Sequence, residues 1–457
     1  MKRVLTSALV LTLSLAAVTV GARAQAGVRP RTAEGAEQEQ NGKGDTVAGA
    51  DAAKANEART LYEEAAQYAQ RKFDEFQKQQ LPYDRLLEQK TLQEQKDLAL
   101  QNAARLAARA PLRGTDIYYS GLLYSLAGKG EGALDSMRKF LADTDPAPAD
   151  LKQRARSVIA QQAAQLGLTE EAERALAEYT KAEPRTVADL HRMNLLVASA
   201  YAKQKDYARA AAPAGAAYAA ALESARTAKD PVQRDTTLFG AGSFYTNVLV
   251  AAGRRAEGLR VAQELRARAV ALPSARLYGQ ATELVLRQGE PFGPPPEIAG
   301  LEPPSPPELV VTELIGEGPV KLSGLRGKVV LLDFWATWCT FCVKTMPRLN
   351  ALHKKHKDEG LVIIGLNEFE GHIKGQPATR AQELEYFRRF KREMNVPYDF
   401  AVAADARNDA PYGVASLPTA VLLDRRGRVR FLTIGASEEE AELLKKMIVK
   451  LLDEPAP

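Results

Sequence analysis

The chain has 457 residues, of which 45% are hydrophobic and 26% are charged, and its formal net charge at pH 7 is +5. Single hydrophobic cores seldom grow beyond about 250 to 300 residues, so this length predicts more than one domain. The composition is that of an ordinary globular protein and the charge is small for the size, so nucleic acid is not an implied partner.

The first residues have the pattern of an export signal. Lys2 and Arg3 precede an apolar stretch over residues 4–20, and the letters ARA at 22–24 fit the small-x-small pattern of a signal peptidase site. We therefore expect residues 1–24 to be a signal peptide and the protein to be exported to the periplasm. An uncleaved signal would instead tether the protein to the membrane, although its apolar stretch is short for a membrane span.

Composition then changes twice before the middle of the chain. Residues 25–56 contain no aromatic and almost no large aliphatic side chain, so we expect a disordered, flexible tether. From residue 57 to about residue 288, apolar side chains recur at steps of three and four, which is typical of long amphipathic helices.

A spacing recurs within the predicted helical domain, residues 57–288. It is seen at 121–133, 160–172 and 198–210, and more weakly at 246–258, each time with small residues followed by a Gly or Lys at a predicted turn. This resembles the tetratricopeptide pattern of paired antiparallel helices, a fold that implies a protein partner. No copy has the family's full signature, so a generic Ala-rich helical bundle remains the alternative.

Residues 289–307 contain eight prolines. Because proline removes a backbone donor and fixes φ, neither a helix nor a packed sheet is expected there, and we interpret the segment as an inter-domain linker. A stiff linker of this kind carries little packing. We therefore expect residues 295–457 and residues 57–288 to fold independently of each other.

The last predicted domain, residues 308–457, alternates apolar runs with helical patterns. Such alternation indicates an α/β fold with a central sheet. The predicted strands cover residues 328–335, 361–366, 399–403, 420–423 and 429–434, and the predicted helices cover residues 341–357, 379–394 and 438–452.

The only two cysteines, Cys339 and Cys342, are three positions apart between a predicted strand and a predicted helix. The N-terminus of a helix favours an anion, so Cys339 should have a stabilised thiolate and act as a nucleophile. Cys342 lies one turn further, close enough to attack a mixed disulfide on Cys339. Thiol–disulfide exchange needs this pair and no other cofactor.

Two other uses of the pair are less favoured. Zinc needs four ligands, and the sequence has no second cysteine pair. We expect His353 and His356 to form part of the solvated face of a Lys-rich helix. We therefore expect no metal site. A purely structural disulfide would close a gap of only two residues and would constrain the unfolded chain very little.

The segment "VVLLDFWATWCTFCVKTMP" resembles the active-site segment of thioredoxin-fold proteins, and "LSGLRGKVVLLDFWATWC" resembles the exported TlpA/ResA-like branch. The resemblance covers residues 295–455. It implies a thioredoxin-like domain in which Cys339 is the attacking sulfur, Cys342 the resolving sulfur and Trp338 a shield over the site.

The dipeptide between the two sulfurs is Thr340-Phe341, and we expect both residues to contact the substrate. It is neither the Gly-Pro of reducing thioredoxins nor the Pro-His of oxidising relatives. The direction of electron flow therefore stays open at this point.

Asp333 occupies the position of the family's buried acid. A carboxylate inside the apolar run "VVLLDFW" is expensive to bury, and burial would raise its pKa, as a proton acceptor for Cys342 requires. The alternative is a strand-end Asp that reaches solvent.

The stretch "VASLPTAVLLD" resembles the family's cis-proline loop. By that resemblance Pro418 faces the cysteines and the backbone of Leu417 pairs with an extended substrate; a trans proline that opens a strand is the alternative. The ResA-like branch also has a glutamate beside the pair. Counting along "GLNEFE" assigns that place, and a proton-relay role, to Glu370, with Glu368 two residues away and a solvated side chain as the alternative for either.

The sequence therefore predicts an exported thiol–disulfide oxidoreductase that reduces disulfides of exported proteins, as in cytochrome c biogenesis, and that draws electrons from an upstream membrane donor. A redox-responsive binding scaffold, in which the helical repeats carry the main function, is the alternative from another class. A peroxidase is disfavoured because no Pro-x-x-x-Thr-x-x-Cys pattern precedes Cys339.

Overall fold

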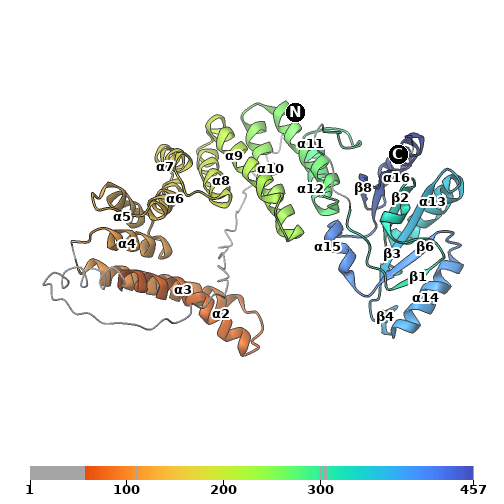
Figure 1. Cartoon of the computed structure of the whole chain (residues 1–457), viewed down its shortest axis with the longest axis horizontal. Helices are drawn as coiled ribbons and strands as arrows, with labels where there is room; N and C mark the ends of the chain where they lie inside the picture. The colour runs from red at the N-terminus through yellow and green to blue at the C-terminus, as the bar shows by residue number, and fades with distance from the viewer. Residues whose placement is uncertain (1–56, 110, 299–300, 302–305, 456–457) are drawn as a thin grey trace, which may run out of the picture. The chain divides into compact units, whose positions relative to one another are not determined.

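The computed structural model describes residues 57–109, 111–298, 301 and 306–455. The expected signal peptide, residues 1–24, and the expected tether, residues 25–56, lie outside the described residues. Within those ranges a helical region comes first and a thioredoxin-like domain with a mixed sheet follows (Figure 1). The fold class expected from the sequence is confirmed.

The helical region consists of consecutive helices joined by short turns. Side-chain oxygens cap several N-termini; Asp84, for example, accepts hydrogen bonds from the N–H groups of Leu86 and Leu87. The helices are α2 (Tyr68–Lys78), α3 (Arg85–Ala107), α4 (Thr115–Leu126), α5 (Gly130–Ala142), α6 (Ala149–Gln165), α7 (Thr169–Lys181), α8 (Val187–Lys203), α9 (Tyr207–Ala225), α10 (Pro231–Ala251), α11 (Arg255–Ala271) and α12 (Ala275–Arg287).

Each of the four recurring segments covers the end of one helix, a tight turn and the start of the next helix. The pairs are α4–α5, α6–α7, α8–α9 and α10–α11. The turns contain Gly128, Gly167, Lys205 and Gly253, which have φ values of 71°, 78°, 63° and 77°. The repeated Gly or Lys therefore marks a left-handed residue that ends the first helix of each pair. The relation of these pairs to tetratricopeptide repeats stays a prediction.

Of the four left-handed residues in these turns, Lys205 is the only one that is not glycine, which gives a stability prediction. A left-handed conformation costs an L-residue roughly 1 kcal/mol that glycine does not incur. The Lys205 side chain is exposed, so Lys205→Gly is expected to raise the free energy of unfolding by about 0.5 to 1 kcal/mol. Urea unfolding of the full chain tests this prediction. Gly167→Ala is the matched control, because it places a side chain at an equivalent left-handed residue and should lower the free energy of unfolding. A destabilised Lys205→Gly variant would contradict the prediction.

The thioredoxin-like domain is built on a six-stranded sheet with the order β1-β6-β3-β2-β7-β8. Strands β2, β3 and β6 are parallel, whereas β1, β7 and β8 each pair antiparallel with a neighbour. The strands are β1 (Glu313–Ile315), β2 (Val329–Phe334), β3 (Leu361–Glu368), β6 (Asp399–Ala403), β7 (Thr419–Leu423) and β8 (Val429–Ile434), and a separate hairpin is formed by β4 (His372–Ile373) and β5 (Gln376–Pro377).

Strand β2 is buried along its whole length, as its run of branched apolar residues predicts. The helices of this domain are α13 (Thr340–His356), α14 (Arg380–Glu393), α15 (Asp409–Tyr412) and α16 (Glu438–Asp453), with the 3₁₀ turns η1 (Leu322–Leu325) and η2 (Ala406–Asn408). Each predicted strand and helix of the sequence analysis corresponds to one of these elements, whereas β1 and the β4–β5 hairpin were not predicted.

The helical region and the sheet are in direct contact. The described residues between 57 and 455 belong to one compact unit, in which α11 and α12 contact β8. The ring of Tyr278 on α12 meets the ring of Phe431 on β8 edge to face, with centroids 6.2 Å apart. The Glu297 carboxylate, in the Pro-rich segment, lies 3.1 Å from Arg430 and 3.5 Å from Lys450. These contacts contradict the expectation that the proline-rich segment carries little packing, whereas independent folding of residues 295–457 stays a prediction.

This contact predicts that loss of Tyr278 weakens the whole unit. Tyr278 and Phe431 are both buried, and truncation of a buried aromatic side chain costs about 3 to 5 kcal/mol. Tyr278→Ala is therefore expected to lower the thermal midpoint of the thioredoxin-like domain and not only that of the helices. Tyr278→Phe is the matched control, because it keeps the ring contact. A thioredoxin-like domain that melts unchanged in Tyr278→Ala would show that the domains are independent.

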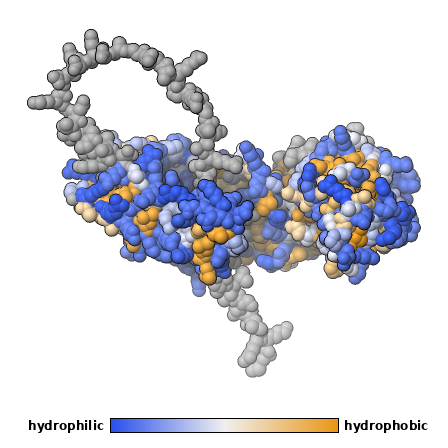
Figure 2. Space-filling model, turned by 90° about the horizontal axis from the view of Figure 1, so that it is seen from below, coloured by the Kyte–Doolittle hydropathy of each residue, from blue (hydrophilic) through white to orange (hydrophobic). Residues whose placement is uncertain are grey.

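The surface in Figure 2 is mostly hydrophilic, with hydrophobic side chains gathered in smaller patches, one of them on the thioredoxin-like domain at the right. Among the residues that the structure describes, no helix has both the length and the apolar character needed to cross a bilayer.

Candidate active site

The two cysteines form a disulfide at the start of α13, with their Cα atoms 5.2 Å apart. Cys339 is the N-cap of this helix, and its sulfur accepts a hydrogen bond from the N–H of Cys342 at 3.2 Å. Cys342 is only 1% exposed and Cys339 is 6% exposed. The first sulfur is therefore the more accessible of the two, and it lies where the unpaired N–H groups of a helix favour negative charge.

Asp333 is buried in the middle of the sheet domain, at 3% exposure. It belongs to β2, where it is in register with Gly365 of β3 and Ala420 of β7. Burial raises the pKa of its carboxyl group from the ordinary value of 3.8 to about 7. The expectation of a buried strand acid agrees with this geometry, and the alternative of a solvent-reaching Asp does not.

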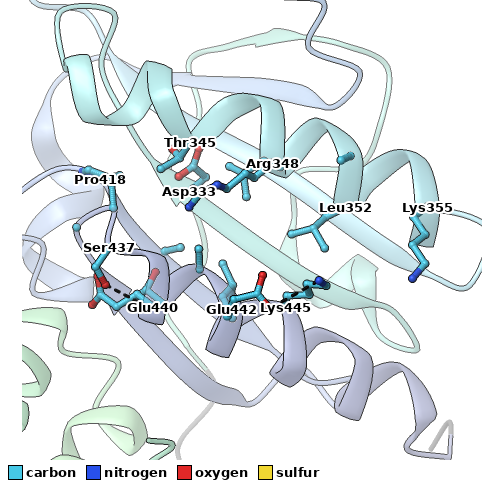
Figure 3. Close-up of a pocket in the computed structure, with 18 residues that line it drawn as sticks. Asp333, Thr345, Arg348, Leu352, Lys355, Pro418, Ser437, Glu440, Glu442 and Lys445 are labelled. Carbon is cyan, nitrogen blue, oxygen red and sulfur yellow. Dashed lines mark hydrogen bonds and ion pairs between the residues drawn. The ribbon is translucent and has the colours of Figure 1, made fainter. Parts of the chain in front are cut away.

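A groove of about 420 Å³ between α13 and α16 reaches Asp333. Figure 3 shows Thr345, Arg348, Leu352 and Lys355 on one helix opposite Glu440, Glu442 and Lys445 on the other, with Pro418 at the same end as Asp333 and Thr345. Thr345 also donates its hydroxyl hydrogen bond to the carbonyl oxygen of Cys342 at 2.7 Å. This groove gives the buried carboxyl group a route for proton exchange with solvent.

Two residues of this groove were missed by sequence reasoning. Thr345 follows Cys342 by one helical turn, and Glu440 lies in the first turn of α16. Burial also raises the pKa of Glu440. The spacing of Thr345 from Cys342 was a usable signal, whereas the approach of α16 to the site depends on tertiary packing that no local pattern reveals.

The Leu417–Pro418 peptide bond is cis, in agreement with the cis-proline loop implied by the resemblance. Pro418 is buried and precedes β7, and Leu417 is half-buried. Among the described residues, neither the N–H nor the carbonyl oxygen of Leu417 has a backbone partner. This leaves one pair of main-chain groups free for an extended peptide, as the role proposed for Leu417 requires.

Two aromatic side chains beside the disulfide are exposed, Trp338 at 62% and Phe341 at 63%. The indole N–H of Trp338 donates to the carboxylate of Glu370, and Thr340 is exposed as well. Glu370 thus lies beside the residue that precedes the disulfide, but the structure shows no bond from it to either sulfur. Its role in proton transfer stays a prediction, as do the substrate contacts of Thr340 and Phe341.

Within the described ranges there is no cluster of three or more His, Cys, Asp or Glu side chains suited to a metal. His356 is buried, and its Nδ1 lies 2.8 Å from the Glu359 carboxylate, whereas His353 is partly buried and lies beside the Tyr398 ring. The expectation that these two histidines form a solvated face is therefore wrong, because both turn toward the domain.

The comparison with known proteins agrees with this site. The family model described as "AhpC/TSA family" matches residues 307–432. The thiol-disulfide oxidoreductase ResA of Bacillus thuringiensis (strain Al Hakam) is 34% identical over 134 residues, which are 29% of this chain and 70% of ResA. The chain belongs to the ResA family of thiol-disulfide oxidoreductases.

Two further relatives each match about a third of this ResA-family protein. Protein DipZ of Mycobacterium bovis is 28% identical over 142 residues, 31% of this chain and 19% of DipZ. A solution structure of a putative protein disulfide isomerase from Bacteroides thetaiotaomicron is 33% identical and covers 33% of this chain and 89% of its own, with a TM-score of 0.28. The ResA-family protein is an oxidoreductase with a thioredoxin-like domain.

Proposed function

We propose that this protein is an exported reductase of protein disulfides, which acts in the periplasm on exported proteins such as apocytochrome c. The observation that carries the proposal is the disulfide at the N-terminus of α13, with its more accessible sulfur on Cys339 and a buried acid of raised pKa at Asp333. Each turnover consumes two electrons, so an upstream membrane protein is proposed to return the pair to its dithiol form.

The reduction proceeds in two exchange steps. The thiolate of Cys339 attacks one sulfur of the substrate disulfide, so that a mixed disulfide forms and the other substrate sulfur leaves as a thiolate that takes up a proton. Cys342 then loses its proton to Asp333 and attacks the sulfur of Cys339, which releases the second substrate thiolate. Two electrons pass to the substrate, and the Cys339–Cys342 disulfide is formed.

The substrate is proposed to bind as an extended segment at Leu417. Its main chain would pair with the free N–H and carbonyl oxygen of Leu417, as in the addition of a strand to a sheet edge. The exposed rings of Trp338 and Phe341 would supply apolar contacts on either side of Cys339. This main-chain pairing does not depend on the substrate's sequence. Side-chain contacts must therefore decide which cysteine of the substrate is attacked.

The helical region is proposed to bind a protein partner. A redox-responsive scaffold is a second candidate, favoured by the direct contact of α12 with β8, which pairs with β7, the strand that begins immediately after Pro418. The two candidates differ in turnover, since a scaffold needs no catalytic reduction of a substrate disulfide.

The test is a reduction potential together with turnover of insulin. The potential of the Cys339–Cys342 pair in the full chain is measured against glutathione and dithiothreitol mixtures, and a value near the roughly −270 mV of thioredoxin is expected. A value near the roughly −120 mV of strong exported oxidants would overturn the reductase direction. Failure to reduce insulin catalytically with dithiothreitol as donor would favour the scaffold.

A further inference from the structure

A small pocket of about 50 Å³ lies beside the disulfide, between Trp338 and Leu417. Its volume admits about three or four water-sized groups, which suits the end of one side chain and not a whole small molecule. Apart from two tryptophans, its polar lining residues carry carboxylate or amide side chains: Asn367, Glu368, Glu370, Asp405, Asn408 and Asp409.

The negative charge of this pocket is only partly neutralised. Asp405 is paired with Arg407 at 2.6 Å, and Glu370 lies 3.7 Å from His372. Glu368 and Asp409 have no cationic partner anywhere in the described parts of the chain. Burial raises the pKa of Glu368, and repulsion from Asp409, Glu370 and Asp405 raises it further. A cation that entered the pocket would relieve this repulsion.

Three buried polar atoms of residues that line the pocket have no hydrogen-bond partner among the described residues: Nδ2 of Asn367, Oε2 of Glu368 and the indole Nε1 of Trp335. Asn367 is 8% exposed; its Oδ1 accepts the N–H of Glu368 at 2.7 Å, but its Nδ2 donates to nothing. The Oε2 atom of Glu368 is buried and likewise accepts no hydrogen bond. Buried donors and acceptors are nearly always paired in native proteins. The orphan donor of Asn367 and the orphan acceptor of Glu368, adjacent residues at the end of β3, therefore point to a ligand that supplies both a carbonyl oxygen and a cationic N–H group.

We propose that this pocket binds a lysine or arginine side chain of the substrate polypeptide, close in sequence to the cysteine that is reduced. The inference rests on the proposed function and names a specificity determinant for it. A polypeptide supplies both missing partners, because its cationic side chain reaches Glu368 and Asp409 while a backbone carbonyl accepts from Asn367. Leu417 forms one wall of the pocket and also offers the free main-chain groups, so the same extended segment can occupy both places. The exposed indole of Trp338 adds an aromatic surface that attracts a cation.

The test uses the reduced full chain and synthetic peptides that carry one cysteine as a 2-pyridyl disulfide. In one series a lysine is placed at each offset from −3 to +3, and in the matched series norleucine replaces it. Release of 2-thiopyridone gives the second-order rate constant under single-turnover conditions. At one offset the lysine peptide is expected to react about tenfold faster than its norleucine partner. This factor is the gain in binding expected from one buried charge-assisted hydrogen bond. The ratio should fall only modestly in 0.5 M salt, because salt screens a buried charge pair much less than an exposed one.

Variants are compared by this lysine-to-norleucine ratio, so their absolute rates do not matter. The double variant Glu368→Gln/Asp409→Asn should reduce the ratio below about threefold, and Glu368→Lys should favour a glutamate peptide instead. Glu385→Gln, an exposed acid on α14, is the matched control and should keep the ratio. Equal rates for lysine and norleucine peptides at every offset would overturn the subsite and leave the reductase proposal standing. No reaction with either series would overturn both.

Discussion

Cys339→Ser is expected to abolish disulfide reduction, whereas Cys342→Ser is expected to accumulate a stable mixed disulfide with its substrate. The two sulfurs differ because only Cys339 accepts a helix N–H and has the greater exposure, while Cys342 is almost fully buried in the first turn of α13. A serine hydroxyl is far too weak a nucleophile to replace a thiolate in either role. Turnover should therefore fall below detection in both variants, but for different reasons.

The measurement separates these reasons. Each reduced variant is mixed with oxidised insulin, quenched with acid and alkylated, and the covalent adduct is quantified by mass spectrometry of the intact chain. Cys342→Ser should show a near-stoichiometric adduct that dithiothreitol removes, and Cys339→Ser should show almost none. The double variant is the control for non-covalent carry-over. Equal adducts in the two single variants would overturn the assignment of roles.

Most of the site could be predicted because its parts are local in sequence. The apolar run that surrounds Asp333, the Cys339–Cys342 spacing and the residue before Pro418 are each visible within a few positions, and the strands and helices around them begin and end close to where periodicity places them. Strand β1 and the β4–β5 hairpin could not be predicted, since strands of two or three residues are shorter than the roughly four residues over which alternation can be recognised.

The remaining features depend on contacts between distant segments. The groove beside Asp333 exists because α16 packs opposite α13, and the acidic pocket because η2 and α15 bring Asp405 and Asp409 to the end of β3. The linker was misjudged for the same reason. Its prolines correctly indicate an absence of helix and strand, but the pairing of Glu297 with Arg430 joins residues from separate parts of the sequence. Composition describes the backbone of a segment and not what lies against it.

Asp333→Asn is expected to stabilise the protein at neutral and alkaline pH while it slows the release of the mixed disulfide. In the folded state the pKa of Asp333 is about 7, compared with an ordinary value of 3.8. At a pH between these two pKa values, Asp333 keeps its proton in the folded state but has released it in the unfolded state. The free energy of unfolding therefore falls as pH rises through this window, by about 1.4 kcal/mol per pH unit, and the loss is complete above pH 7.

Asparagine cannot ionise, so the variant avoids this loss. Its free energy of unfolding should match that of the natural chain below pH 4 and exceed it by about 2 to 4 kcal/mol at pH 8, since the full shift is an upper bound. Urea unfolding of the oxidised full chain at pH 4 and pH 8 measures the difference, and the disulfide-bonded cysteines do not titrate in that form. Asp358→Asn, at an exposed position, is the matched control and should change stability by less than about 0.5 kcal/mol at either pH.

The same substitution removes the proton acceptor proposed for Cys342. Attack of Cys339 on the substrate does not pass through this carboxyl group, so its rate should be nearly unchanged. Release of the mixed disulfide should slow about 100-fold, the usual contribution of a positioned acid or base. Stopped-flow traces of Trp fluorescence with a peptide disulfide resolve the two steps. A slowed first step with an unchanged second step, or a stability difference that does not grow between pH 4 and pH 8, would show that Asp333 is not the buried acid of this site.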